Sequence, residues 1–418
     1  MDSLPNFKPD AVQTLAYAAA VLLAGLFLKH KIRVIDRLNI PAPVVGGLLA
    51  AVLLLLMRNT VATFQFDATL SPILNVAFFT TIGMGASLPL LKKGGVPVAV
   101  YLVMAIFLCF AQNFVGMSVA AAFGVSGLVG VMAGSVTLVG GPATGIAFAP
   151  LFEKAGVQGA DSLAIAAATF GIVCGGLLGG PVGTWIIERR LGRKPLARGR
   201  RRATAGEVSP SEAGADSGEG GEAEIILESD REDTPLLRNL IVLGVAMGIG
   251  AVVSAYIQST GVTLPAYIGA MMVASVMRNL DDVTGWLKIH PPTIDLIGNL
   301  SLLFFLAMAL LNLRLWELAH LALPLVVILV AQVVLMGLFA VLVSYPVMGK
   351  NYDSAVMATG LIGFALGTTA NALTNMRALV ERYGPSPKAF LVVPLVGAFF
   401  IDFVNALIIT GYLNWLGN

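Results

Sequence analysis

The chain is poor in charge, because Asp, Glu, Lys and Arg together make up only 12% of its 418 residues. Soluble domains carry about 25%, so an ordinary soluble fold is excluded. Cysteine is scarce as well, and both cysteines, Cys109 and Cys174, fall inside apolar runs. We interpret them as packed thiols with no disulfide between them.

Long apolar runs take the place of the missing charge. Hydrophobic residues make up 57% of the chain, and its mean hydropathy is +0.85. Runs of about 18 or more apolar residues are typical of transmembrane helices, so the fold class is an all-α polytopic membrane protein. The first run follows MDSLPNFKPD, which lacks a basic stretch, and no small-residue cleavage site comes after it. We therefore expect a retained span, not a signal peptide.

Ten apolar stretches predict full spans, and two more are apolar but interrupted by glycine, proline and polar residues. The full spans lie near 12–29, 40–57, 69–91, 96–123, 161–187, 237–257, 263–277, 295–316, 318–346 and 387–413. The interrupted stretches lie near 128–152 and 354–377.

Lysine and arginine cluster in some loops and are scarce in others, which predicts the orientation. The basic loops share the cytoplasmic side only if 128–152 and 354–377 enter the membrane and return without crossing it. Arg314 is the exception, at an outer helix end from which it could snorkel. Both termini then lie on the outer, periplasmic side.

A polar segment divides the chain into two membrane halves. Residues 203–235 are rich in Gly, Ser and Glu and have few apolar residues, which is typical of a disordered cytoplasmic linker. We expect an N-terminal membrane repeat over 1–190, the linker over 191–235, and a C-terminal membrane repeat over 236–418.

The two halves resemble each other. Four short matches follow in order, with the offset growing from 222 to 228 residues, as short insertions would produce. Each half has five spans and one re-entrant stretch, and since five is odd, the second copy must be inverted in the membrane. The matches join PVVGGLLAAV from Pro43 to PAYIGAMMVA from Pro265, Met84 to Met308, Val131 to Val356, and Glu153 to Glu381.

Inverted repeats with broken helices are a layout of many secondary transporters. Broken backbone survives in a membrane only where protein buries it or where it lines a cavity. The first such segment is GSVTLVGGPATG at 134–145, where Ser135, Thr137 and Thr144 supply hydroxyls and Gly141 precedes Pro142. Its N–H groups could hold an anion, and freed carbonyls could hold Na⁺. A helix-packing site is the alternative.

The second broken segment is GLIGFALGTTANALTNM at 360–376. So many amides and hydroxyls in apolar surroundings need partners, either a ligand or one another within the bundle. Arg377 directly follows the segment. It either attracts an anionic substrate or is an ordinary positive-inside anchor. Its other candidate residues are Gly367, Thr368, Thr369, Asn371, Thr374 and Asn375.

Asp402 lies deep in an apolar span, with Asn405 on the same helix face. An intramembrane carboxylate indicates a functional site, here a Na⁺ ligand or a proton carrier; a helix-joining ion pair or hydrogen bond is the alternative. Gln112 and Asn113 are interpreted as interhelical hydrogen-bonding groups. Glycines at four-residue steps indicate a helix-packing face, which could slide, and not a ligand site; they are Gly171, Gly175, Gly179 and Gly183.

At this point the chain resembles the bacterial sodium/glutamate symporter family over nearly its whole length apart from the linker. The motifs that carry the resemblance are VTLVGGPATG, AAATFGIVCGGLLGGPV, LFFLAMALLNLRLWELA, MGKNYDSAVMA and ERYGPSPKAFLVVPLVGAFFIDFVNALII. The resemblance implies Na⁺-coupled uptake of glutamate across the bacterial inner membrane, two inverted five-span halves and a homodimer. It also implies an elevator-like movement of one part against another.

The resemblance is not complete in the broken segments. The family's first loop usually reads GGHGTG, whereas this chain has Pro142 and Ala143. In the second loop, Leu361 and Ile362 stand for His-Cys, and Asn371 for a proline; further departures are Ala365 for a glycine and Pro387 for a histidine. The residues that match the family pattern are Thr144, Thr368, Thr374, Asn375, Asp402 and Asn405.

The first hypothesis is therefore a Na⁺-coupled symporter of L-glutamate, or of another small anionic amino acid or dicarboxylate, working in a lipid bilayer without a nucleic-acid partner. A channel or uniporter that uses the same loops as a filter is the second. An enzyme ranks last, because all three histidines lie at span ends or in loops. We expect substrate at Ser135, Thr137, Gly141, Thr144, Gly367, Thr368, Thr369, Asn371 and Arg377, and Na⁺ at Thr374, Asn375, Asp402 and Asn405.

Overall fold

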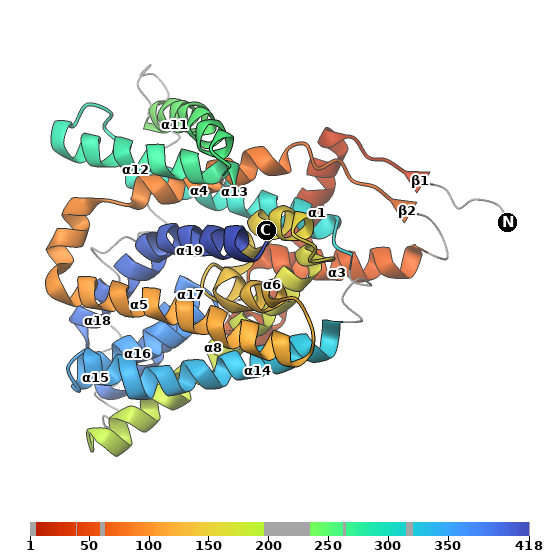
Figure 1. The fold of residues 1–418 in the computed structure, drawn as a ribbon. Coiled ribbons are helices and arrows are strands. Elements are labelled where there is room, and N and C mark those ends of the chain that lie inside the picture. The colour runs from red at the N-terminus through yellow and green to blue at the C-terminus, as the bar shows by residue number, and fades with distance from the viewer. Residues whose placement is uncertain are drawn as a thin grey trace.

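The computed structural model describes residues 6–38, 40–58, 63–195, 235–261, 265–314 and 321–417. Most of the linker predicted over 191–235 lies outside the described residues. The described part is almost entirely helical (Figure 1), with one two-stranded parallel sheet that pairs β1 with β2.

Helices in the first half follow the predicted spans closely. A short π-helical turn, η1, continues α6, and the strands are β1 (Asn6–Phe7) and β2 (Thr63–Phe64). The helices and η1 are α1 (Ala11–Lys31), α2 (Arg33–Arg37), α3 (Ala42–Met57), α4 (Ser71–Gly85), α5 (Leu88–Ala122), α6 (Gly127–Val131), η1 (Met132–Val136), α7 (Gly141–Lys154) and α8 (Ala160–Arg190).

The second half repeats this order of elements, and in each half a pair of helices forms the predicted interrupted stretch, α6 and α7 in the first and α16 and α17 in the second. Two further π-helical turns, η3 and η4, interrupt its long helices. The elements are α11 (Pro235–Ser259), α12 (Ala266–Thr284), α13 (Pro291–Leu311), α14 (Ala322–Phe339), η3 (Ala340–Ser344), α15 (Tyr345–Val347), α16 (Tyr352–Ala365), α17 (Thr369–Tyr383), α18 (Pro387–Leu395), η4 (Val396–Phe400) and α19 (Ile401–Leu416).

Six helices in the described part are long and apolar enough to cross a membrane. A helix rises about 1.5 Å per residue, so about 20 residues span a hydrocarbon core about 30 Å thick. The other predicted spans correspond to α3, α4, α12 and α18–α19. The six are Ala11–Lys31, Gly94–Ala122, Ala160–Arg190, Pro235–Ser259, Pro291–Leu311 and Ala322–Val347.

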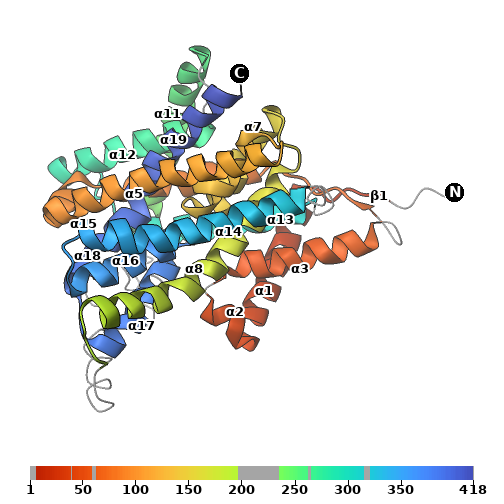
Figure 2. The ribbon, with the colours of Figure 1, turned by 60° about the horizontal axis from the view of Figure 1, so that its bottom comes forward.

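The helices form two groups, each built from both halves of the chain. The six-helix group contains α1, α3, α4, α11, α12 and α13: α3 packs on α1 and α13, α12 packs on α11 and α4, and α4 packs on α13. Figures 1 and 2 show α11 and α12 at one edge of this group and α1 and α3 at the other. The break-containing group comprises α5–α8 and α14–α19.

Close helix crossings occur at corresponding places in the two halves. An added Cβ on Gly46 of α3 would lie 2.0 Å from the Val21 carbonyl oxygen of α1. A Cβ on Gly269 of α12 would lie 2.4 Å from the Gly250 carbonyl oxygen of α11. Only glycine permits such an approach of two helix backbones, so each half opens with the same glycine-mediated helix pair.

The two groups meet along a limited set of elements: α7 lies against α13, η4 against α4, and α12 against α5 and α19. Aromatic rings fill part of this boundary. The ring of Tyr267 on α12 stacks on Phe79 of α4 with centroids 3.9 Å apart, and Phe148 of α7 meets Tyr267 edge-on at 5.8 Å. The boundary therefore combines these aromatic contacts with polar ones, such as the hydrogen bond from the Leu88 backbone N–H of α5 to Asn279 Oδ1 of α12 at 2.8 Å.

Candidate functional site

The first interrupted stretch is a pair of helices joined by irregular backbone at 137–140. The backbone of Gly134 leaves helical geometry inside η1, with φ −103° and ψ −128°. Helix α7 starts at Gly141, whose φ is +67°, a left-handed value that favours glycine. Pro142 follows in the first turn of α7, where its missing N–H costs nothing. Proline thus starts a new helix here and does not kink an old one.

The second interrupted stretch breaks in the same way between α16 and α17. Helix α16 ends at Ala365, and the Thr368 hydroxyl accepts a hydrogen bond from the backbone N–H of Asn371 at 3.4 Å, which caps α17. The Thr369 hydroxyl donates to the Gly397 carbonyl of η4 at 2.9 Å. Threonine at these positions therefore satisfies groups that the break exposes.

The two breaks meet. A Cβ built on Gly141 would lie 3.6 Å from the carbonyl oxygen of Gly367, so these two segments, far apart in sequence, are in near contact. The meeting point gathers the N-terminal end of α7, which has no side-chain cap, and the C-terminal end of α16. The positive N-terminal end of one helix and the carbonyl-rich C-terminal end of another thus lie within one small region.

Two adjacent side chains of α5 hold the broken backbone on either side. Gln112 Nε2 donates to the Ala365 carbonyl at the end of α16, at 2.9 Å. Asn113 Oδ1 accepts from the backbone N–H of Ser135 in η1, also at 2.9 Å. Gln112 and Asn113 are therefore the interhelical hydrogen-bonding groups that the sequence predicts, and they tie both breaks to one helix.

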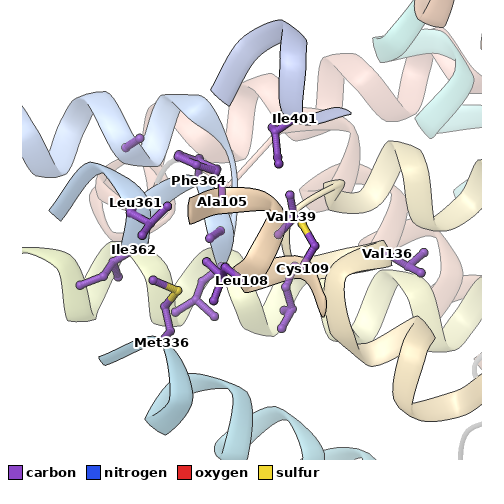
Figure 3. Packing of buried hydrophobic residues seen from close by; sticks show 14 of the residues in the cluster. Ala105, Leu108, Cys109, Val136, Val139, Met336, Leu361, Ile362, Phe364 and Ile401 are labelled. Carbon is purple, nitrogen blue, oxygen red and sulfur yellow. The ribbon is translucent and has the colours of Figure 1, made fainter. Parts of the chain in front are cut away.

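Gln332 is a residue that sequence reasoning missed. It lies in α14, fully buried, and its Nε2 donates to the backbone carbonyl of Gln112 at 2.7 Å. Its signal in the sequence is its place as a lone amide in an apolar span. Figure 3 shows buried apolar side chains of the same helices, including Leu108 of α5 and Met336 of α14.

Helix α19 reaches the first break. Asn405 Nδ2 donates to the Ser135 carbonyl at 2.9 Å, and Asp402, half-buried, precedes Asn405 by about one turn on the same face. The Thr137 hydroxyl, by contrast, donates to the Met132 carbonyl at 2.7 Å and so closes the π-helical turn.

Several fully buried oxygens in this region have no hydrogen-bond partner among the described residues. An unpartnered buried oxygen costs about 1–3 kcal/mol, and side-chain and carbonyl oxygens are what a hard cation prefers. Such oxygens are therefore of the type that coordinates Na⁺. These oxygens are Ser135 Oγ, Asn405 Oδ1, Asn371 Oδ1, Gln112 Oε1 and Gln332 Oε1.

Helix α17 presents its predicted residues on two faces. Asn371 Nδ2 donates to the Ile172 carbonyl, and Asn375 Nδ2 to the Gly175 carbonyl, both at 2.9 Å, so both amides join α17 to α8. Thr374 and Arg377 are exposed. The contacts of Asn375 and Asn405 thus lead to different elements, α8 and η1.

The glycine face of α8 packs on this second pair of helices. A Cβ at Gly171 would lie 2.3 Å from the Leu366 carbonyl oxygen, and one at Gly179 would lie 2.2 Å from Asn375 Nδ2. Side chains at these positions would push the second break away. The face is therefore a packing surface, as its spacing predicts, and it sets the position of Asn375.

Comparison with known proteins identifies the family of this chain. A family model described as sodium/glutamate symporter matches residues 7–385. The chain is 39% identical over 409 residues to a sodium/glutamate symporter of Escherichia coli K12, covering 97% of this chain and 98% of the relative. It is 38% identical over 412 residues to one of Haemophilus influenzae, covering 96% of each chain. The family-model match, the identities of this extent and the six apolar membrane-length helices in the described residues mean that this chain belongs to the sodium/glutamate symporter family of membrane transporters and is not an enzyme.

Proposed function

We propose that this protein carries L-glutamate into a bacterial cell by symport with Na⁺ across the inner membrane. The observation that carries the proposal is the meeting of the two breaks at Gly141 and Gly367. Relatives that match nearly the whole chain are named sodium/glutamate symporters. A site where the positive end of one helix lies beside the carbonyl end of another suits an anion and a cation bound together.

The substrate binds between the tips of the two breaks. Backbone N–H groups at the start of α7 hold a carboxylate, and the hydroxyl of Thr144, buried in the second turn of α7, lies close by. Arg377 is exposed, and its positive charge attracts the anionic substrate as the substrate approaches the site. The remaining substrate residues are Ser135, Thr137, Gly141, Gly367, Thr368, Thr369 and Asn371.

Sodium binds beside the substrate. Asn405 of α19 reaches the first break at Ser135, whose hydroxyl has no partner in the described structure, and Asp402 lies about one turn before Asn405 on the same helix face. Thr374 and Asn375 are the proposed Na⁺ ligands on α17, where Asn375 lies beside α8 and not at the first break. A carboxylate with neighbouring neutral oxygens gives a site with enough charge to compete with water for Na⁺.

Movement of the break-containing group against the six-helix group supplies alternating access. Support comes from the limited set of elements along which the groups meet and from the composition of each group, which draws on two halves with the same order of elements. In this proposal the halves are inverted repeats, each with five spans and one re-entrant pair of helices, and both termini are periplasmic. The six-helix group forms the homodimer, and the moving group carries the substrate as an elevator.

Uptake into liposomes tests the proposal. Purified protein should accumulate labelled L-glutamate above the outside concentration only with an inward Na⁺ gradient. A tenfold gradient supplies about 1.4 kcal/mol per coupled ion, enough for about tenfold accumulation. Flux that only equilibrates and ignores Na⁺ would point to the alternative, a channel or uniporter. Competition by aspartate and by dicarboxylates decides between glutamate and other small anions.

A further inference from the structure

A polar cavity of about 680 Å³ lies away from the two breaks, where the ends of four helices meet. The C-terminal ends of α3 and α13 line it from the six-helix group, and the end of α7 and the start of α8 line it from the other group. Its volume is typical of sites for small molecules, which span about 300–1,000 Å³. It therefore lies on the boundary between the two groups.

The cavity gathers charge in a chain that has little. Two guanidinium groups, Arg58 and Arg314, and two carboxylates, Glu153 and Asp161, line it. Arg58, Asp161 and Arg314 each interact with neighbouring groups, so a ligand would join an existing polar network. Arg58 and Arg314 both lie at predicted outer helix ends, against the positive-inside pattern, and the cavity gives them a reason to be there.

A buried hydroxyl marks where a ligand's carboxylate would sit. Ser162 lines the cavity in the first turn of α8, is 1% exposed, and its Oγ has no hydrogen-bond partner among the described residues. Gly159, which precedes α8, gives that helix no side-chain cap. An oxygen anion there would meet a hydroxyl donor, free N–H groups and a positive helix end.

The mixture of charges selects the kind of ligand. A bare dicarboxylate would be attracted by the guanidinium groups but repelled by Glu153 and Asp161. An amino-acid zwitterion matches both the basic and the acidic side chains, because its carboxylate faces Ser162 and the arginines while its ammonium faces the carboxylates. These four charged side chains therefore favour a ligand with an amino group over a dicarboxylate without one.

We propose that this cavity is a second, weaker binding site for an amino-acid zwitterion, which collects substrate on the outer side before it reaches the breaks. The proposal rests on the proposed function for its orientation, since α3, α7, α8 and α13 all have these ends on the predicted outer side. It adds a Na⁺-independent site to the Na⁺-dependent one at Gly141 and Gly367.

Equilibrium binding of labelled L-glutamate to purified full-length protein in Na⁺-free choline buffer tests the site. Wild type should show saturable binding, and Arg314→Gln should weaken it roughly tenfold, as expected for loss of one charge-assisted hydrogen bond. In cells, the same variant should raise the KM for uptake and leave the maximal rate unchanged. Arg189→Gln, an equal change of charge at the exposed inner end of α8, is the control and should leave both unchanged.

A second variant tests the zwitterion. Glu153→Gln should weaken Na⁺-free binding of L-glutamate but not of glutarate, which lacks the amino group. Size-exclusion profiles and the maximal Na⁺-driven uptake rate report whether each variant is folded, and Arg314→Lys should restore part of the binding.

Three results would overturn the second site: no saturable Na⁺-free binding by wild type, equal behaviour of Arg314→Gln and Arg189→Gln, or equal loss of glutamate and glutarate binding in Glu153→Gln. Failure of the proposed function looks different. Wild-type protein would then not accumulate glutamate with a Na⁺ gradient, whatever the Na⁺-free binding shows.

Discussion

Gly141 and Gly367 face each other at the tips of two broken helices, with a Cβ on the first placed only 3.6 Å from the carbonyl oxygen of the second. The two residues lie in different halves of the chain, and each lies where one helix stops and another starts. Their proximity brings together polar backbone that neither half could keep in a membrane alone.

Gly141→Ala should impair transport through backbone strain. A Cβ at this site meets nothing closer than ordinary contact distance, but the φ of +67° costs a non-glycine residue about 1–2 kcal/mol. The tip of the first break should shift, and the KM of Na⁺-driven uptake should rise several-fold. Gly180→Ala, where an added Cβ meets nothing within 4 Å, is the control. Equal KM values for the two variants would contradict the role given to Gly141.

Gly179→Ala should destabilise the protein. The new methyl group would lie 2.2 Å from Asn375 Nδ2 and displace the amide from the Gly175 carbonyl. Overpacking of this kind costs about 1–3 kcal/mol, which should lower the thermal unfolding midpoint of purified protein and weaken Na⁺ binding. Gly176→Ala, whose nearest contact would be 3.8 Å away on the same helix, should change neither. A stable Gly179→Ala protein would mean that α8 and α17 do not pack this closely.

Gln112→Met should lower stability while keeping the side-chain volume. The change leaves the buried carbonyl of Ala365 without its donor, at a cost of about 1–3 kcal/mol. Thermal unfolding in detergent measures the shift. The same replacement at exposed Gln158 should change the unfolding free energy by about 0.5 kcal/mol or less. If the two variants unfold together, Gln112 does not hold the second break.

Asp402→Asn should abolish or strongly weaken the Na⁺ dependence of glutamate uptake, because the proposed site loses its one negative charge. The measurement is the initial uptake rate as a function of Na⁺ concentration in proteoliposomes. Asp36→Asn, at an exposed position in α2, is the charge-matched control. An unchanged Na⁺ profile for Asp402→Asn would remove this carboxylate from the ion site.

Much of the fold could be predicted from the sequence because a membrane imposes simple rules. Apolar length located the long helices, and glycine, proline and hydroxyl residues located both interruptions. The repeat alignment was less accurate. The sequence match pairs Pro43 with Pro265, whereas the structure caps α3 with Pro41 and α12 with Pro265, in nearly the same backbone conformation. Short matches in apolar sequence leave such shifts of two residues open.

The sequence by itself determined the class of protein, the helices and the two places where helices break, because hydropathy and backbone propensity are local properties. Only the tertiary structure decided that Gly141 lies against Gly367, that Asn405 binds the Ser135 carbonyl while Asn375 binds α8, and that Arg58 and Arg314 share a cavity. Contacts between residues so far apart in sequence depend on how the helices pack, and no local pattern contains that information.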